Sequence, residues 1–205
     1  MSKQGRYGKY GEQKRIARLR DAGTQQQDSH QKADPRISKN LRHHGKGSAK
    51  PKIVIQKADR SDVGFIRSLS ETVFSPYGPY GNLLPEWFLT GLVVALKAVM
   101  RKTPRGFFML GIMDKGPLRI RRAELVAVAV EPEFQGMGVG DRLMTAGLKM
   151  AEERSIEQVI LHTGVDNLAA QALFEKHGFV LSGRKEGFYP NGQNALKMTR
   201  AMATG

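Results

Sequence analysis

The feature that most constrains the fold is a segment at residues 123–142 that reads AELVAVAVEPEFQGMGVGDR. Its first part, residues 124–130, is an unbroken apolar run of the kind that forms a buried central strand. Pro132 ends this run, because proline lacks the N–H that a strand ladder requires. Residues 135–140 then carry a glycine at every second position, and a helix is predicted to begin near Gly138. The segment therefore predicts a strand, a tight turn and a glycine-rich loop that opens into a helix.

The glycine-rich loop predicts a binding site for a phosphate or pyrophosphate group. Glycines let backbone N–H groups approach a ligand closely, and the helix adds unpaired N–H donors and the positive end of its dipole. The loop is not a P-loop, because no lysine follows the glycines. It is not a dinucleotide fingerprint either, because Asp141 stands where that pattern requires glycine. Glycine-rich loops of this kind also occur as simple tight turns, so the flanking sequence decides whether the loop is a phosphate site.

The order of these features resembles the coenzyme A motif of the GNAT superfamily of acyl-CoA N-acyltransferases. That motif has an apolar strand with an acidic residue at its start, then a turn, then Q-x-x-G-x-G at a helix N-terminus. Here Glu124 begins the strand and Gln135 begins the glycine pattern. The resemblance covers about residues 53–202 and is strongest from residue 123 onward.

Two later segments extend the resemblance. Residues 167–179, NLAAQALFEKHGF, are similar to the superfamily pattern N-x-A-A-x-x-L-Y-E-x-x-G-F, with Phe174 in place of the usual tyrosine. The sequence GFYP at residues 187–190, followed by a strand expected over 195–202, resembles the closing hairpin of peptide-amine acetyltransferases. The resemblance implies an α/β (α+β) GNAT fold, in which a central mixed sheet with splayed strands is flanked by helices.

Periodicity and turn residues predict the elements of this fold. Strands are expected over residues 53–57, 107–113, 124–130 and 157–163, and helices over 62–74, 84–101, from about 138, and within 167–179, where Gly178 closes the helix. Ser61 is expected to cap the first helix, and Pro85 to lie in the first turn of the second. Residues 107–130 have room for two clear strands, whereas the family usually has three; the third is either vestigial or formed by residues 118–121. The Tyr/Pro/Gly-rich segment 75–81 is expected to be a loop, which either sets acceptor specificity or is an ordinary connection.

The charge of the chain is distributed unevenly. The formal net charge is +14, and residues 1–52 hold eight Lys and six Arg against four acidic residues, a net charge of +10. These residues have few large apolar side chains, so we expect a largely disordered basic extension over 1–52 and a GNAT domain over 53–205. The extension either binds nucleic acid or the ribosome, or is a solvated and functionally neutral segment.

Composition excludes other kinds of chemistry. The chain has no cysteine, which excludes disulfides, thiolate metal sites and an acetyl-cysteine intermediate. His and carboxylate residues show no metal-ligand spacing, so no metal site is expected. The most hydrophobic stretch, residues 83–100, is interrupted by Pro85, Glu86 and Lys97, which argues against a membrane span. We therefore expect a cytoplasmic protein without a membrane partner.

The resemblance implies an N-acetyltransferase that moves an acetyl group directly from acetyl-CoA to a primary amine of a protein or small molecule. The alternative is a catalytically weak coenzyme A-binding module whose basic extension holds nucleic acid or the ribosome. In both cases the resemblance assigns coenzyme contacts to the backbone along the strand, to the glycine-rich loop and to the following helix. The residues concerned are Val128, Ala129, Val130, Gln135, Gly136, Met137, Gly138, Val139, Gly140, Asn167 and Phe174.

Two residues are candidates for the base that takes a proton from the amine. His162 stands where enzymes that acetylate protein N-termini carry a glutamate, five residues before the asparagine that matches Asn167. Glu124 matches the A-E-[IL]-V strand start that carries the base of histone-type enzymes. Strand alternation is expected to place Glu124, Val126 and Val128 on one face. Each candidate could instead have a purely structural role, Glu124 as the ion-pair partner of a nearby arginine.

The sequence also does not decide which residue acts as the general acid that protonates the departing thiolate. Phe174 cannot donate a proton, and Tyr189 is the nearest substitute, although Tyr189 could instead shape the acceptor site. A thiolate, with an ordinary thiol pKa near 8.5, can also leave without a proton donor.

Overall fold

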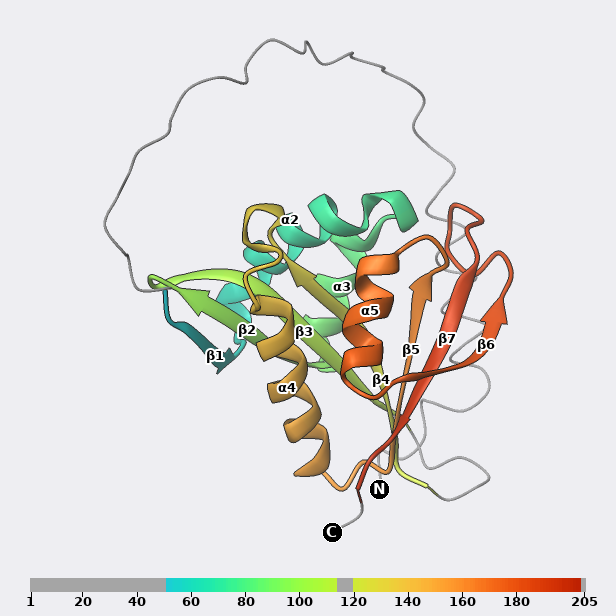
Figure 1. Ribbon diagram of the computed structural model, residues 1–205. Coiled ribbons are helices and arrows are strands. Elements are labelled where there is room, and N and C mark those ends of the chain that lie inside the picture. Colours follow the sequence, from blue (N-terminus) through green and yellow to red (C-terminus); the bar gives the residue numbers. More distant parts are fainter. Residues whose placement is uncertain (1–50, 114–119, 204–205) are drawn as a thin grey trace, which may run out of the picture.

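The computed structural model describes residues 51–113 and 120–203, and these residues form one mixed sheet of seven strands. The strand order is β1-β2-β3-β4-β5-β7-β6, and within the described residues β4 and β5 are the only parallel pair. Figure 1 shows the arrangement. The strands are β1 (Ile53–Lys57), β2 (Val94–Met100), β3 (Thr103–Met113), β4 (Arg122–Val130), β5 (Gln158–Gly164), β6 (Val180–Lys185) and β7 (Ala195–Ala201).

Helices cover both faces of the sheet (Figure 1). They are α2 (Val63–Phe74), α3 (Tyr80–Leu89), α4 (Val139–Glu152) and α5 (Leu168–Lys176), with three short 3₁₀ turns, η1 (Arg60–Asp62), η2 (Ser75–Tyr77) and η3 (Pro132–Phe134). α4 and α5 pack on one face and α2 and α3 on the other. The fold is the mixed, helix-flanked sheet that the sequence predicts.

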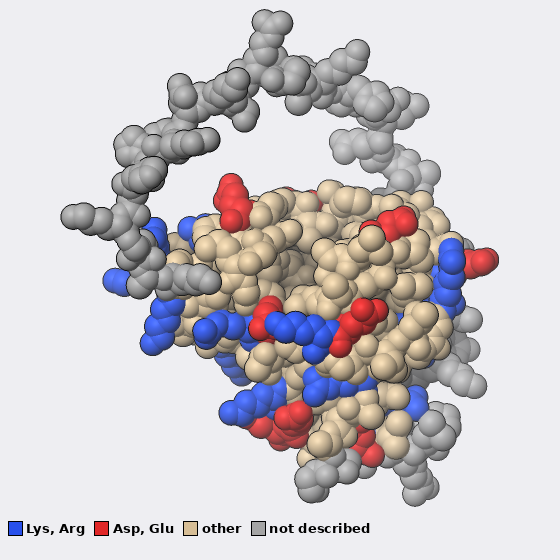
Figure 2. Space-filling model, in the orientation of Figure 1, with Lys and Arg blue, Asp and Glu red and all other residues tan. Residues whose placement is uncertain are grey.

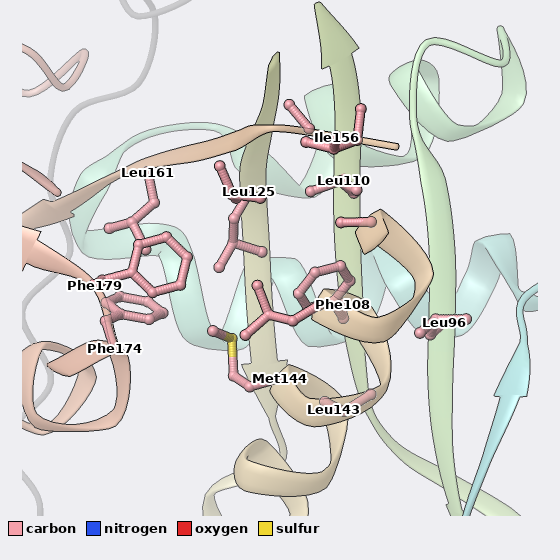
Figure 3. Close-up of a cluster of buried hydrophobic side chains, with 14 of the residues drawn as sticks. Leu96, Phe108, Leu110, Leu125, Leu143, Met144, Ile156, Leu161, Phe174 and Phe179 are labelled. Carbon is pink, nitrogen blue, oxygen red and sulfur yellow. The ribbon is translucent and has the colours of Figure 1, made fainter. Parts of the chain in front are cut away.

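Each face of the sheet has its own apolar core. On the α4 side, Phe108, Leu143 and Leu161 are completely or almost completely buried, together with Phe174 and Phe179 of the α5 region (Figure 3). On the α2 side, the core is formed by one buried stripe of α2 and α3 against the sheet, including Ile66, Leu84, Phe107 and Met109. Burial of a side chain of this size stabilises a fold by about 1.5–3 kcal/mol. These two cores hold β4 rigidly at the centre of the domain.

β4 and β5 pair over only four positions. The register runs from Arg122 with Gln158 to Leu125 with Leu161, and beyond that point each strand continues without pairing with the other. Figure 1 shows the two strands diverging toward the end of the sheet where α4 begins. This confirms the expected splay. It also leaves one edge of β4, over residues 126–130, without a β5 partner.

A bulge in β4 changes which side chains share a face. Met109 pairs with Ala127 but Leu110 pairs with Leu125, so Val126 is an extra residue in the β4 ladder. As a result Val128 packs against the α4-side core, whereas Val126 packs against the α2-side core. The expectation that Glu124, Val126 and Val128 lie on one face was therefore wrong for Val128, because a bulge interrupts the alternation.

The helix expected over residues 84–101 was wrong. The helix ends at Leu89, Gly91 adopts a left-handed φ of +73°, and residues 94–100 form β2, paired with both β1 and β3. A glycine with positive φ ends a helix because it frees the chain to turn away. β2 is therefore the strand that seemed missing, so no vestigial strand is needed. Residues 120–121 lie outside any strand, and residues 118–119 lie outside the described part of the chain.

The region expected to be a loop at residues 75–81 is only partly irregular. It contains η2, and α3 already begins at Tyr80, so Pro85 lies inside α3 and not in its first turn. Proline cannot donate to the carbonyl four residues earlier, which here is that of Gly81. The Arg67 guanidinium donates to this Gly81 oxygen over 3.4 Å and to Asn82 Oδ1 over 2.6 Å. An arginine from α2 thus supplies the donor that Pro85 lacks.

The first helix also begins differently from the expectation. The N-cap of α2 is Asp62, and not Ser61, and it makes no side-chain capping bond. The capping box lies one turn earlier, in η1, where the Asp59 side chain accepts from the Ser61 N–H and the Asp62 side chain accepts from the Asp59 N–H. The buried residues of α2 are Ile66, Leu69 and Ser70. The expected strands over 53–57, 107–113, 124–130, 157–163 and 195–202 are confirmed within a few residues. The basic extension lies outside the described residues except for residues 51–52.

Candidate active site

The candidate site is a cavity of about 110 Å³ where β4 and β5 diverge. β4 and β5 form its floor, α3 and the segment that precedes it cover it from one side, and the connection between β6 and β7 covers it from the other. Its lining is mostly aromatic and aliphatic. The polar or aromatic members most relevant to chemistry are Tyr77, Tyr80, Trp87, Glu124, His162, Thr163, Asn167, Phe188 and Tyr189.

His162 and Glu124, the two candidate bases, contact each other in this cavity. Glu124 lies on the paired part of β4, and His162 is the first β5 residue beyond the last β4 pairing. His162 Nδ1 lies 3.3 Å from Glu124 Oε1, and only 5% of the His162 side chain and 12% of the Glu124 side chain are exposed. A carboxylate accepts hydrogen bonds, so Nδ1 carries the proton in this contact and donates it. The two candidates therefore form one unit.

The second ring nitrogen of His162 is the reactive atom that this arrangement leaves free. With Nδ1 protonated, the neutral imidazole has its lone pair on Nε2. His162 Nε2 is buried and has no hydrogen-bond partner among the described residues. The Phe188 ring stacks on the imidazole at 4.4 Å with an interplanar angle of 21°, which fixes the plane of the ring. His162 thus has a ring plane fixed by Phe188 and a proton acceptor, Nε2, without a partner among the described residues.

Tyr189 lies in an aromatic cluster that lines the same cavity. Its ring centroid is 4.6 Å from that of Tyr77, 6.5 Å from Tyr80 and 5.1 Å from Phe188. Burial raises the pKa of the Tyr189 phenol well above its ordinary value, and the neighbouring Tyr80 and Tyr77 raise it further. The phenol therefore keeps its proton throughout the neutral and moderately alkaline range, as a proton donor must.

The segment 75–81 contributes to the cavity through Tyr77 and Tyr80. Tyr77 fits there because Gly164, the last residue of β5, has no side chain; a Cβ on Gly164 would lie 2.8 Å from the Tyr77 ring. Segment 75–81 was expected either to set acceptor specificity or to be an ordinary connection. Its tyrosines line the cavity, so it is more than a surface connection. The side chain of Asn191 also donates to the carbonyl of Pro76, which ties this segment to the β6–β7 connection.

The glycine-rich loop lies where β4 ends and α4 begins. Gly136 and Gly138 have left-handed φ values of +72° and +85°, and a Cβ at either would meet nothing within 4 Å. Gly138 is the N-cap of α4 and supplies no side chain to the first helical N–H groups, which therefore remain available to a ligand. The loop is exposed and its backbone is open to solvent. These are the properties of an anion cradle at a helix N-terminus.

Neighbouring side chains hold this loop in place. Gln135 Nε2 donates to the carbonyl of Val130 over 3.1 Å, and Arg105 donates to Glu131 over 2.8 Å while it stacks on Phe134 at 4.4 Å. In the first turn of α4, Asp141 accepts from Lys176 Nζ over 2.6 Å and from His177 Nε2 over 3.0 Å. The hydrogen bond from Lys176 lowers the pKa of the Asp141 carboxyl, and that from His177 lowers it further. The one carboxylate at this helix N-terminus is thus neutralised by two partners.

The remaining predicted coenzyme residues surround the same opening. Val128 lines the cavity, and the Val128–Val130 backbone lies along the β4 edge that has no β5 partner. Asn167 caps α5, accepting from the Ala170 N–H over 3.1 Å through Oδ1, which leaves its Nδ2 donor toward the cavity lining. Phe174 is 5% exposed and packs edge-on against Phe179 at 6.1 Å. Phe174 therefore contributes an apolar wall.

Sequence reasoning missed several members of the cavity. Phe188 was noted only as part of the GFYP segment, although its ring is the surface on which His162 rests. Trp87, Phe74 and Thr163 were not predicted as site residues at all. Phe188 could have been predicted, because it directly precedes the candidate Tyr189. Trp87 was not predicted, because residues 84–101 were expected to form one continuous helix.

The described residues offer neither a metal site nor a membrane-spanning helix. They contain no group of three or more His, Asp or Glu side chains that could hold a metal ion. None of their helices has the length and hydrophobicity that a membrane span needs.

Comparisons with known proteins agree with this geometry. The acetyltransferase (GNAT) family matches residues 64–179, which is more than half of the chain. The chain therefore belongs to the GNAT family of acetyltransferases. The matched range includes the bulged strand, the glycine-rich loop and both helices that border the opening.

Individual relatives are similar over shorter stretches. A mycothiol acetyltransferase of Paenarthrobacter aurescens is 44% identical over 57 residues, which are 28% of this chain and 18% of the relative. N-alpha-acetyltransferase 30 of Schizosaccharomyces pombe is 32% identical over 76 residues, 37% of this chain and 51% of the relative. The matches thus span about half or less of these relatives. The crystal structure of Arabidopsis thaliana NAA60 with acetyl-CoA superposes with a TM-score of 0.65 at 16% identity, over 74% of this chain and 99% of that one, and shows the shared fold.

Proposed function

We propose that this protein is an N-acetyltransferase that transfers an acetyl group from acetyl-CoA directly to a primary amine. The observation that carries the proposal is the buried His162–Glu124 pair, set where two strands diverge. His162 of this pair lines the cavity and its Nε2 has no partner among the described residues, and an open glycine cradle lies at the end of the strand that carries Glu124. Family membership and acetyltransferases among the relatives support the same reaction.

The residues present fit coenzyme A. The Gly136 and Gly138 cradle suits a pyrophosphate, since it offers backbone N–H groups, and no Cβ would block it. The unpartnered edge of β4 at Val128–Val130 would hold the amide-rich pantetheine arm, with Asn167 Nδ2 as a further donor. When bound, acetyl-CoA supplies the activated acetyl group. A backbone N–H of this β4 edge would then stabilise the negative charge that develops on the acetyl oxygen.

His162 is the proposed base. An amine attacks only in its neutral form, and an alkyl ammonium has a pKa far above 7, so a group in the cavity must accept its proton. His162 Nε2 is free to do so, and Glu124 holds the imidazole in the required tautomer and stabilises the imidazolium that forms. This division of roles is that of the histidine and carboxylate in a catalytic triad. Glu124 thus acts through His162.

Tyr189 is the proposed proton donor to the departing thiolate. Burial keeps its phenol protonated, and it lines the same cavity as His162, with the Phe188 ring in contact with both rings. Phe174, which occupies the usual tyrosine position, only closes the apolar wall. Because a thiolate can leave unaided, we expect Tyr189 to assist the reaction and not to be indispensable.

The acceptor we favour is an amine at the end of a protein or peptide chain. Two relatives are named as N-alpha- or ribosomal-protein acetyltransferases, one being the Escherichia coli ribosomal-protein-S18-alanine N-acetyltransferase, whose structure shares the fold at a TM-score of 0.62 and 19% identity. Tyr77, Tyr80 and Trp87 give the cavity an apolar, aromatic wall, which suits a small uncharged first side chain better than an acidic one. The mycothiol acetyltransferases make a small-molecule amine the second candidate.

The test is acetyl-CoA-dependent thiol release with a panel of peptide and small-molecule amines, combined with mass mapping of the products. We expect thiol release that depends on the amine and a product heavier by one acetyl group. If acetyl-CoA binds in calorimetry but no amine increases thiol release above the hydrolytic background, the chain is a coenzyme-binding module instead. Loss of both binding and turnover would contradict the coenzyme assignment itself.

A further inference from the structure

A second surface, remote from the cavity, has a composition that the acetyl-transfer reaction does not explain. It is a shallow hollow at the β1 edge of the sheet, lined by Lys52, Val54, Gln56, Lys97, Val99, Arg101, Lys102 and Pro104. Val54 and Gln56 lie on the sheet face that α2 and α3 cover elsewhere, and both are exposed here. None of these residues lines the catalytic cavity. We call this surface the basic hollow.

The positive charge of the basic hollow is not neutralised by neighbours. No carboxylate is among its lining residues. Lys97 is paired with Asp62 at 2.8 Å, but Lys52, Arg101 and Lys102 form no ion pair within the residues that the structure describes. Figure 2 shows Lys and Arg side chains without Asp or Glu among them along the edge where Figure 1 places β1 and the β2–β3 turn. The hollow therefore has three free cations around its rim.

Two of these cations occupy a turn that they destabilise. Met100 pairs with Thr103, so Arg101 and Lys102 alone connect β2 to β3, and their φ values are +49° and +67°. A two-residue turn with two positive φ values is of type I′, and Asn-Gly is the sequence that favours it. Long side chains with positive φ cost stability, and such strain concentrates at functional positions. Arg101 and Lys102 therefore occupy positions at which they lower the stability of the fold.

We propose that the basic hollow binds single-stranded nucleic acid. Three free cations suit the phosphates of a backbone, and the floor of Val54, Val99 and Pro104 suits the apolar face of a sugar or base, which a single strand exposes. Lys52, which lines the hollow, is also the last residue of the basic segment 1–52.

The test uses the full chain and a labelled oligouridine of about 15 nucleotides, with oligothymidine of equal length as the DNA probe. The main variant is Arg101→Asn with Lys102→Gly, which removes two charges and introduces the preferred turn sequence. We expect its affinity for the oligonucleotide at low salt to fall about fivefold or more, and its log–log salt slope to decrease by about 1.4, that is 0.7 for each lost phosphate contact. Because the turn improves, Tm should stay equal or rise, and acetyl transfer to a small amine should be unchanged.

A matched control removes two exposed cations at other places. Lys149→Gln with Arg184→Gln does so on α4 and on β6, the strand at the opposite edge of the sheet. We expect this control to bind the oligonucleotide like the wild type, and Lys52→Gln alone to lose affinity. Equal affinity for the Asn-Gly variant and the wild type would refute the proposal, as would an equal loss in the control pair. Equal or tighter binding of polyglutamate or of phosphatidylserine vesicles would assign the hollow to another class of partner.

Discussion

At the residue scale, the chemistry depends on the contact between His162 and Glu124. Neither residue is unusual by itself, and from the sequence alone each could have had a purely structural role. The structure changes this, because the two side chains meet where both are almost fully buried, and His162 Nε2 has no partner among the described residues. A buried polar atom without a partner costs free energy, so a function for it is the economical explanation.

The first prediction concerns this pair. His162→Gln should lower kcat/KM for an amine acceptor about 10²-fold or more, the usual loss when a general base is removed. Glu124→Gln should lower it less, because the free imidazole can still accept a proton when its orientation is lost. Acetyl-CoA affinity should survive both changes, since neither side chain is near the glycine-rich loop. A larger loss for Glu124→Gln would make Glu124 the base, and full activity of the double variant would exclude both residues.

The second prediction concerns Tyr189 and alkaline stability. The raised pKa means that the folded state keeps this proton above pH 10, where an unfolded tyrosine loses it. The unfolded state then binds fewer protons than the folded state, so the free energy of unfolding falls as pH rises, by at most about 1.4 kcal/mol per pH unit. In denaturant unfolding, the difference in the free energy of unfolding between the wild type and Tyr189→Phe should be constant from pH 6 to about 9. Above about pH 10 only the wild type should lose this increment; parallel curves throughout would contradict the raised pKa.

At the element scale, β4 organises the site through three local features. Its first half pairs with β5 and places Glu124 beside His162; the bulge at Val126 reverses the faces; and its second half leads into the glycine-rich loop without a β5 partner. Because the bulge reverses the alternation, Val128 packs against the α4-side core while Glu124 faces the cavity. A regular strand would have placed Val128 on the same face as Glu124.

The third prediction concerns the loop that follows β4. Gly138→Glu should weaken acetyl-CoA binding by at least about 10-fold, because a carboxylate would stand at the cradle where anionic phosphates bind. Gly91→Glu is the matched control, since Gly91 also has a left-handed φ, +73°, and open space around it, but lies after α3. Both changes should cost similar stability in thermal unfolding. Unchanged calorimetric affinity in the Gly138 variant, or an equal loss in the Gly91 variant, would remove the loop from the coenzyme site.

Sequence patterns predicted the elements that carry strong local signals. The strand, loop and helix over residues 124–152 were predictable, since apolar periodicity, proline and glycine all agree there. β2 was missed because it is entered after Gly91 and left by Arg101-Lys102, a hairpin turn without the usual Asn-Gly. The bulge and the contact of His162 with Phe188 depend on the pairing of strands and loops remote in sequence, which no local pattern encodes.

At the scale of the whole molecule, the core residues of the described part of the chain fall within one range. β1 begins at Ile53 and, among the described residues, pairs with β2 alone, and the described residues of both cores lie within 53–202. The basic extension and the domain are thus expected to be separable.

The fourth prediction follows from this separation. A shortened chain that begins at Ala49 should fold, keep its Tm and bind acetyl-CoA as tightly as the full chain, because no described core residue precedes Ile53. It should also keep acetyl transfer to a small amine, while its retention on nucleic acid at low salt decreases with the lost charge. Circular dichroism, calorimetry and a filter-binding assay measure these properties. If this chain fails to fold or to bind acetyl-CoA, the boundary at residues 52–53 is wrong.

The short pairing of β4 with β5 has a mechanical consequence. Within the described residues, the ladder between the four-stranded half, β1 to β4, and the three-stranded half, β5 to β7, has four residue pairs. A pantetheine arm lying between them would take the place of the missing ladder and join the halves as a substitute strand. Without acetyl-CoA, the two halves should open locally between β4 and β5, so backbone amides near the diverging ends of these strands should exchange hydrogen quickly. Binding of acetyl-CoA should slow this exchange. The donor would complete the architecture of the enzyme that consumes it.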